Sequence, residues 1–336
     1  MEPPYAIIDA LPVGLPRPRW SVLIPCYNCA GFLEKTLASV LTQALSTEEM
    51  EILVVDDCST RDDPAEVVER LGKGRVRFLR QSKNVGKVRN FETGLEASRG
   101  HLIHQLHGDD LVLPGFYEAM DAAFTLYPEV GAFFCESDYI DEKGRITGRT
   151  GIELDETGVL PAWLPKIAVS NRIQTPSVVV RRGVYETLGG FDRRLDCTED
   201  WEMWIRIANR FPFGFCVEAR AQYRSSSGNT SSLGIISGAF GTEIKRGVLP
   251  IVDSYLPMEL LESVRDARDL SQAYFFAANI PGVLRNSGIK SWLMICHETL
   301  RFSKRPEIIR RIVSLTLRAL MKRELLLVPS GQGDSL

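Results

Sequence analysis

Three pairs of neighbouring carboxylates could do chemistry in this sequence: Asp56-Asp57, Asp109-Asp110 and Glu199-Asp200. Adjacent carboxylates repel each other unless a cation or hydrogen-bond donors neutralise them. Mg²⁺ typically binds one or two carboxylates together with the phosphates of a substrate. A carboxylate can also accept hydrogen bonds from a nucleobase or ribose, or act as a general base toward a hydroxyl. The pairs therefore make a metal site, a nucleoside contact and a base possible.

Each pair also has a structural interpretation. Gly-Asp-Asp at 108–110 is common in turns, and the residues after Asp57 could cap the next helix through Ser59 or Asp62. Glu199-Asp200 opens a predicted helix, where a carboxylate is stabilised by the helix dipole. Taken singly, the pairs leave both interpretations open.

Histidines and cysteines do not suggest a second metal site. His101, His104 and His107 lie on or beside a predicted strand, so His104 faces away from the other two. His101 and His107 are about 20 Å apart at about 3.3 Å per residue. Cys26 and Cys29 form a single CxxC without the further ligands that structural zinc needs.

The elements that position these residues alternate between strand and helix in the first 110 residues. Short apolar runs predict buried strands, and apolar residues at three- and four-residue spacings predict amphipathic helices. This order is typical of an α/β fold with a mostly parallel sheet covered on both faces. Ligands of such sheets bind beyond the carboxyl ends of the strands, which is where 25–28, 56–57 and 107–110 fall. The predicted strands are 21–25, 51–55, 76–80 and 102–106, and the predicted helices are 31–45, 64–72 and 91–98.

The pattern loosens after about residue 130. We expect strands at 130–135 and 177–182, a tryptophan-rich helix at 199–210, a small-residue loop at 225–241, and only helices from about 243. The expected organisation is an extended arm (1–18), an α/β domain (19–240) and a C-terminal helical region (241–336).

Composition excludes several classes of protein. The 336 residues are 44% hydrophobic and 25% charged, with a net charge of −3, which argues against disorder and against a globally basic nucleic-acid binder. Seven scattered cysteines favour a reducing, cytoplasmic compartment over a disulfide framework. No signal peptide or transmembrane run is predicted. The sequence has no GxGxxG, GxxxxGK[ST] or GxSxG motif, which disfavours nicotinamide Rossmann enzymes, P-loop enzymes and standard esterases.

Six motifs in order resemble those of the family 2 glycosyltransferases. The resemblance covers about residues 20–225 and implies the GT-A fold, a Rossmann-like, mostly parallel nucleotide-binding sheet, here with a C-terminal helical extension. It implies that residues 19–240 are a GT-A catalytic domain, with a nucleotide-sugar-binding half (19–135) and an acceptor-binding half (136–240). Each motif is weak singly, and their order and spacing carry the resemblance. The motifs are SVLIPCYN (21–28), EILVVDDCS (51–59), NVG…RN…G (84–94), LHGDDLVLP (106–114), RR…GGFD (181–192) and TEDWEMWIR (198–206).

The resemblance implies a role for each matching residue. Asp200 corresponds to the catalytic base of an inverting displacement, and Asp109 to the last acid of a DxD motif that holds Mg²⁺ or Mn²⁺ on the donor diphosphate. Tyr27 would pack against the nucleobase and Asp57 would hydrogen-bond it. The other expected nucleotide-sugar contacts are Pro25, Asn28, Asn84, Lys87 and Asp110.

Three residues depart from the family pattern. His107 replaces the first acid of DxD, Cys29 stands where an acid often follows Tyr-Asn, and Ser226 replaces the histidine of Tyr-Arg-x-His. Because a neutral hydroxyl is a poor metal ligand, the ion would depend on Asp109, phosphates and water.

The C-terminal region is basic. Residues 285–325 hold ten lysines or arginines and three glutamates, a net charge of +7, and Ile309, Ile312, Val313, Leu317 and Leu320 recur at helical spacing. Such a helix could lie on an anionic membrane surface, or pack on the catalytic domain or on a second copy in a homodimer.

We expect an inverting glycosyltransferase that moves a sugar from a nucleotide-sugar, with UDP as the expected nucleotide, to a saccharide or lipid-linked acceptor. The setting would be cell-surface polysaccharide or glycoconjugate biosynthesis, in the cytoplasm or on the inner face of the membrane, without a nucleic-acid partner. The altered residues His107 and Ser226 keep two alternatives open. One is a catalytically silent nucleotide-sugar-binding or scaffolding protein, and the other is a nucleotidyltransferase on the same fold.

Overall fold

A computed structural model describes residues 4–225 and 230–325. Strands from both halves of the described chain join one sheet in the order β3-β2-β1-β4-β9-β6-β10-β5, with β7 beside β6 and β8 beside β10. The first four are parallel to one another, whereas β9 is antiparallel to both β4 and β6. The strands are β1 (Trp20–Cys26), β2 (Met50–Asp56), β3 (Arg77–Arg80), β4 (Leu102–Gln105), β5 (Leu111–Val112), β6 (Ala132–Ile140), β7 (Ile146–Arg149), β8 (Gly158–Val159), β9 (Val178–Arg181) and β10 (Phe213–Arg224).

Helices cover both faces of the sheet, so its central strands contribute side chains to two cores. Along β1, Val22 and Ile24 enter one core and Leu23 enters the other, because successive side chains point to opposite faces. The helices of the first half are α1 (Ala30–Leu41), α2 (Pro64–Gly72), α3 (Lys87–Ala97) and α4 (Phe116–Leu126), followed by α5 (Trp163–Val169), the short 3₁₀ turn η1 (Thr175–Ser177), α6 (Arg182–Leu188) and α7 (Glu199–Ala208).

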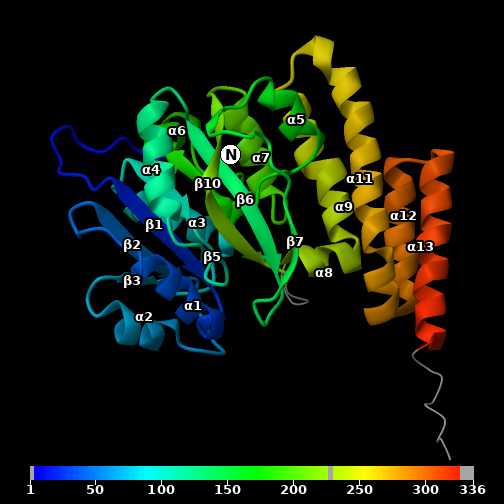
Figure 1. The fold of residues 1–336 in the computed structure, drawn as a ribbon, viewed down its shortest axis with the longest axis horizontal. Coiled ribbons are helices and arrows are strands. Elements are labelled where there is room, and N and C mark those ends of the chain that lie inside the picture. The colour runs from blue at the N-terminus through cyan, green and yellow to red at the C-terminus, as the bar shows by residue number, and fades with distance from the viewer. Residues whose placement is uncertain (1–3, 226–229, 326–336) are drawn as a thin grey trace, which may run out of the picture.

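The C-terminal part of the described chain is helical. Its helices α11, α12 and α13 stand side by side at one end of the molecule, with α13 outermost (Figure 1). No helix among the described residues is long and apolar enough to cross a membrane. The elements are α8 (Thr230–Ser237), α9 (Ala239–Glu243), the π-helical turn η2 (Ile244–Val248), α10 (Leu249–Asp253), α11 (Met258–Asn286), α12 (Gly288–Phe302) and α13 (Pro306–Leu325).

The parallel first half and the helical C-terminal part confirm the expected fold class, but some boundaries differ. The helix expected at 31–45 ends at Leu41, where the N–H of Gln43 bonds the Val40 carbonyl in a tighter turn. The helix expected at 91–98 begins at Lys87, directly after Gly86, whose φ of 86° turns the chain into it. Local backbone geometry therefore decides both boundaries.

The loop expected at 225–241 is wrong for residues 230–237 and 239–241, which belong to α8 and α9, and residues 226–229 lie outside the described chain. Ile235, Ile236 and Phe240 are partly buried against the core, and this packing overrides the weak helix propensity of a Ser- and Gly-rich segment. Gly238, at φ 79°, separates the two helices, and a Cβ there would lie 2.7 Å from the Met294 sulfur.

The first segment lies against the second half of the domain. Residues 4–18 form no helix or strand, yet Ala6 and Ile8 are buried in the core. The N–H of Gly190 donates to the Ala6 carbonyl at 2.8 Å. The segment is therefore held by packing and by main-chain hydrogen bonds.

Candidate active site

The carboxyl ends of β1, β2 and β4 meet at one edge of the sheet. The N–H of Asp57 donates to the Cys26 carbonyl at 2.9 Å, and the N–H of Gly108 donates to the Pro25 carbonyl at 3.0 Å. A Cβ at residue 108 would lie 2.7 Å from the Cys29 sulfur, so this close approach requires glycine. The three strand ends singled out in the sequence are therefore neighbours.

The loop after β1 exposes one aromatic ring. Pro25 is buried, whereas Tyr27 is 47% exposed. Asn28, at φ 51°, accepts N–H bonds from Thr60 and Arg61 through its side-chain oxygen, at 2.9 and 3.0 Å. Asn28 thus holds the loop that follows β2, and it leaves the Tyr27 ring at the surface.

Cys26 and Cys29 lie on either side of this loop as free thiols, with their sulfurs 3.1 Å apart. The hydrogen bond with Cys29 and burial both raise the pKa of Cys26. The pair packs beneath the loop as two small side chains.

Asp57 joins the strand ends to the start of α3. Its carboxylate is 3% exposed and accepts the N–H groups of Val85 at 2.7 Å and Gly86 at 3.0 Å. Burial raises the pKa of Asp57, and the two hydrogen bonds oppose that rise. Asn84 is exposed on the same loop. Asp57 therefore fixes the loop that leads into Lys87.

Lys87 connects this edge to α7. Its Nζ lies 2.8 Å from Glu199 Oε1. Burial alone would lower the pKa of Lys87, but the charges of Glu199, Asp200 and Asp196 outweigh it and raise the pKa. The first residue of α3 and the first residue of α7 are thus joined by an ion pair.

Glu199 and Asp200 are held differently at the start of α7. Glu199 is 3% exposed, its Oε2 has no hydrogen-bond partner, and burial raises its pKa to about 7 despite Lys87. Asp200 is half-buried and accepts the Trp201 N–H at 2.6 Å and the Asn171 side-chain amide at 3.3 Å. Burial also raises the pKa of Asp200. Asp200 therefore has a fixed orientation and a pKa moved toward neutrality.

The turn after β4 presents Asp109 and buries Asp110. Asp110 is 1% exposed; its Oδ1 accepts the Arg224 N–H at 2.8 Å, while its Oδ2 has no hydrogen-bond partner and lies 3.9 Å from His107 Nδ1. The Arg224 guanidinium donates to the Asp109 carbonyl at 2.8 Å and covers the Phe32 ring at 4.8 Å. Burial raises the pKa of both aspartates.

His107 packs on α3, the helix that begins at Lys87. Its ring stacks on Phe91 with centroids 5.3 Å apart. Burial, and then the charge of Lys87, lower the pKa of His107 to about 3. The other two histidines lie apart from it, since His101 is exposed and His104 is buried between the Tyr117 hydroxyl and the Pro176 carbonyl. His107 is therefore a neutral imidazole at the edge of the site.

Lys87 connects two of these regions. Asp57 accepts the N–H groups of the loop before Lys87, and Glu199, which precedes Asp200, pairs with Lys87. Asp109 and Asp110 follow His107, whose ring stacks on Phe91 of α3. Sequence reasoning did not nominate Asn171, Arg224 or Phe91. Arg224 follows Tyr223 in the Tyr-Arg motif, which could have drawn attention to it, whereas Asn171 and Phe91 carry no local signal. Ser226 lies outside the described residues.

The residues at 107–110 fit a cation that is shared with a substrate. The described residues contain no group of three or more His, Cys, Asp or Glu that could hold a metal ion. Mg²⁺ needs only one or two protein carboxylates when phosphates supply other ligands. Asp109, with the unpartnered Asp110 Oδ2 behind it, meets that smaller requirement.

Comparison with known proteins gives the family that this chain resembles in sequence. Residues 21–179 match the model of glycosyl transferase family 2. An uncharacterized protein of Mycobacterium tuberculosis is 34% identical over 58% of this chain and 63% of its own length. Chondroitin synthase of Escherichia coli is 24% identical over 58% of this chain and 27% of its own length. The chain thus spans less than two thirds of the length of these curated relatives.

Two solved structures share the fold. The S. aureus TarS 1-349 complex with UDP has a TM-score of 0.60 at 14% identity, over 95% of this chain and 94% of that one. A mannosyltransferase of Pyrobaculum calidifontis in complex with GDP-Man and Mn2+ has a TM-score of 0.53 at 16% identity, over 97% of this chain and 92% of that one. These likenesses extend through the C-terminal helices.

Proposed function

Residues 21–179 form a family 2 glycosyltransferase domain, and on that premise we propose that the chain is an inverting transferase that uses a nucleotide-sugar donor. The proposed donor is a UDP-sugar, supported by the UDP complex of a protein with the same fold. The proposed acceptor is a saccharide or lipid-linked saccharide in cell-surface polysaccharide or glycoconjugate biosynthesis, supported by the chondroitin synthase relative. The reducing, cytoplasmic setting stays a prediction.

The donor would lie along the edge formed by β1, β2 and β4. The exposed Tyr27 ring offers a face on which the nucleobase can stack. Asp57 accepts the N–H groups of residues 85 and 86, and Asn84 directly precedes them in the chain. Both residues would contact the nucleoside. Pro25, Asn28 and Lys87 complete the proposed contacts, Asn28 by shaping the loop and Lys87 by placing a cation near the diphosphate.

Asp109 would hold Mg²⁺ or Mn²⁺ on the diphosphate. The buried Asp110 would support Asp109. The metal would supply positive charge to the departing phosphate oxygen. The Mn2+ complex of the mannosyltransferase with the same fold supports a divalent ion. Arg224 holds the 109–110 turn in place through the Asp109 carbonyl and the Asp110 carboxylate.

Asp200 is the proposed base. The acceptor hydroxyl oxygen forms a bond to the anomeric carbon while the bond from that carbon to the diphosphate oxygen breaks on the opposite face. The hydroxyl proton passes to Asp200, and the nucleoside diphosphate leaves. The observation that supports this proposal is the ion pair between Lys87, which follows the loop held by Asp57, and Glu199, which precedes Asp200 in the chain.

Substitution of Asp200 by Asn tests the proposal, because Asn keeps the shape and cannot accept the proton. We expect transfer to fall by about 10²- to 10⁴-fold, with donor binding retained in a thermal-shift assay with Mn²⁺. The measurements are nucleoside diphosphate release and the anomeric configuration of the product. Unchanged turnover in Asp200→Asn contradicts the assigned base. Donor binding without release in either protein favours the silent module, and release of pyrophosphate favours nucleotidyl transfer.

A further inference from the structure

Helix α13 has apolar residues on two faces, and only one of them is packed. Ile308 and Ala319 are buried, and Ile312 and Leu315 are partly buried against the core formed with α11 and α12. The sequence pattern grouped Ile312 with the exposed residues, but Ile312 belongs to the packed face. The second face exposes Ile309, Val313, Leu317, Leu320 and Met321, each by 44 to 56%.

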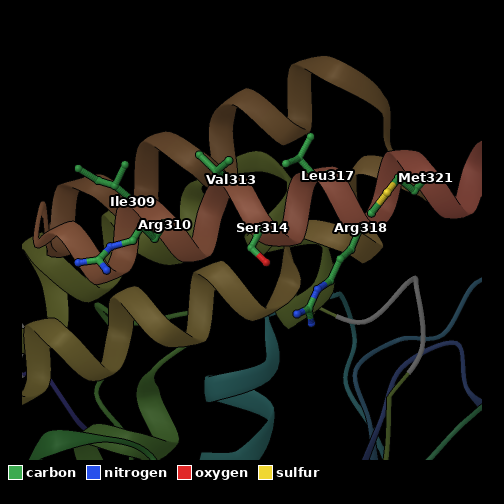
Figure 2. Close-up of a pocket in the computed structure, with 7 residues that line it drawn as sticks. All are labelled: Ile309, Arg310, Val313, Ser314, Leu317, Arg318 and Met321. Atoms are coloured by element: carbon green, nitrogen blue, oxygen red, sulfur yellow. The ribbon is translucent and has the colours of Figure 1, made fainter.

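This second face, the α13 stripe, is continuous along the helix. Ile309, Val313, Leu317 and Met321 recur every four residues, which places them in one row on a helix surface. At about 1.5 Å per residue the row is about 18 Å long. It borders a shallow hollow of about 440 Å³ (Figure 2). Scattered exposed apolar residues are ordinary, but a row of this length indicates a contact surface.

The residues beside the stripe are basic. Arg310 and Arg318 line the same hollow and extend from the helix away from Ile309 and Leu317 (Figure 2). Arg311, one position further around the helix, lies 5.2 Å from the Tyr274 ring. Among the residues of α13 whose side chains are described, Glu307 is the only acid. A partner for this surface must therefore accept apolar side chains and carry negative charge.

Charge selects among the possible partners. A second copy of the chain related by a twofold axis would present the same arginines to Arg310 and Arg318, and like charges in apposition oppose association. An anionic bilayer supplies phosphates for the arginines and an acyl boundary for the aliphatic row. Figure 1 places α13 at the right-hand edge of the molecule, with α12 and α11 to its left. The residues of the α13 stripe are each at least 44% exposed, so the described chain does not cover them.

We propose that the α13 stripe docks the protein on an anionic lipid bilayer. Val313 and Leu317 would enter the boundary between headgroups and acyl chains, and Arg310 and Arg318 would contact lipid phosphates. The other face of α13 stays packed on α11, so the helix lies parallel to the surface. The docking is independent of the transferase reaction, and either proposal can fail without the other.

Vesicle sedimentation with the full chain tests the proposal. We expect binding to vesicles of phosphatidylcholine with about one third phosphatidylglycerol, and binding at least tenfold weaker to phosphatidylcholine alone. The double variant Val313→Asp/Leu317→Asp should weaken binding at least tenfold, because both side chains are 53% exposed and their replacement leaves the core intact. The matched control is Leu126→Asp, a 68% exposed leucine at the end of α4.

The arginines have a separate test. At about 1 kcal/mol for each basic residue near an anionic surface, Arg310→Glu/Arg318→Glu should weaken binding by more than tenfold, and added salt should reduce the difference from wild type. The control Lys35→Glu reverses a charge on the exposed side of α1, at the other end of the molecule. It should bind like wild type.

Two results overturn the proposal. The first is no preference for anionic vesicles, or equal binding by the α13 variants and their controls. The second is a concentration-dependent dimer in sedimentation velocity that the Val313→Asp/Leu317→Asp variant abolishes, which would assign the stripe to a second copy. Circular dichroism of each variant excludes unfolding as the cause of lost binding.

Discussion

The carboxylates at the sheet edge differ from those at the start of α7 in what they contact. Asp57 and Asp110 accept main-chain N–H groups from other segments, of Val85 and Gly86 in one case and of Arg224 in the other. Glu199 instead pairs with the side-chain cation of Lys87, and Asp200 accepts the N–H of its chain neighbour Trp201 and a side-chain amide. The first kind of carboxylate holds backbone in place, whereas the second can exchange a proton without moving a loop.

Substitutions in the two regions should therefore have different effects. Changes at the sheet edge should affect stability first, and activity through displaced loops. Changes at α7 should affect the pH dependence of stability and the proton transfer. Lys87 belongs to both regions, because Asp57 orders the loop before it and Glu199 neutralises it.

The largest expected effect is on pH dependence in Glu199→Gln. Burial raises the pKa of Glu199 from 4.5 to about 7 in the folded protein. Between these values the folded chain retains a proton that the unfolded chain has lost, so stability falls as pH rises through this window. At about 1.36 kcal/mol per unit, the fall is at most about 3 kcal/mol. The amide side chain of the variant does not titrate, so this part of the slope should disappear.

Urea unfolding at several pH values between 4.5 and 7.5 measures the slope. The matched control is Glu96→Gln, an exposed glutamate on α3. It should keep the wild-type slope. Identical slopes in wild type and Glu199→Gln would show that Glu199 titrates like an exposed carboxylate, and would end the distinction drawn between the two regions.

The next largest effect is on stability in Asp57→Ala. The variant leaves the N–H groups of Val85 and Gly86 without their acceptor. Hydrogen bonds to charged groups contribute about 1.5 to 3 kcal/mol, so we expect a loss of about 2 kcal/mol in the free energy of unfolding. Asp63→Ala, which removes an exposed helix cap on α2 and an ion pair with Arg80, serves as the control for the loss of two surface carboxylate bonds. Equal losses in the two variants would contradict the anchoring role.

The sequence predicted the sheet edge well because its signals are local. A buried apolar run such as 51–55 followed by an acidic pair predicts both a strand and the position of its carboxyl end. The parallel order then brings Asp57 and Asp109 to the same edge. The α7 region was harder, because the pairing of Glu199 with Lys87 joins residues 112 positions apart along the chain.

The other features that the sequence did not predict also depend on contacts between residues far apart in the chain. Helices α8 and α9 are stabilised by packing of Ile236 and Phe240 on distant residues, which a Ser- and Gly-rich sequence does not announce. Arg224 reaches the 109–110 turn only because β10 lies beside β5 and β6 in the sheet. The positions of these residues depend on long-range contacts and not on local secondary-structure propensity.

The smallest expected effect is on metal affinity in His107→Asp, and it rests on the proposed function. His107 is a neutral imidazole with a pKa of about 3, held against Phe91 and near Lys87. An aspartate there adds an oxygen ligand, which Mg²⁺ prefers to imidazole. The Mg²⁺ concentration for half-maximal transfer should fall by about threefold, roughly 0.7 kcal/mol at 1.4 kcal/mol per tenfold. His101→Asp, at the exposed opposite end of β4, should leave it unchanged. A metal requirement that is equal in both variants would place the cation away from residue 107, and would leave Asp109 without a neighbour in the metal site.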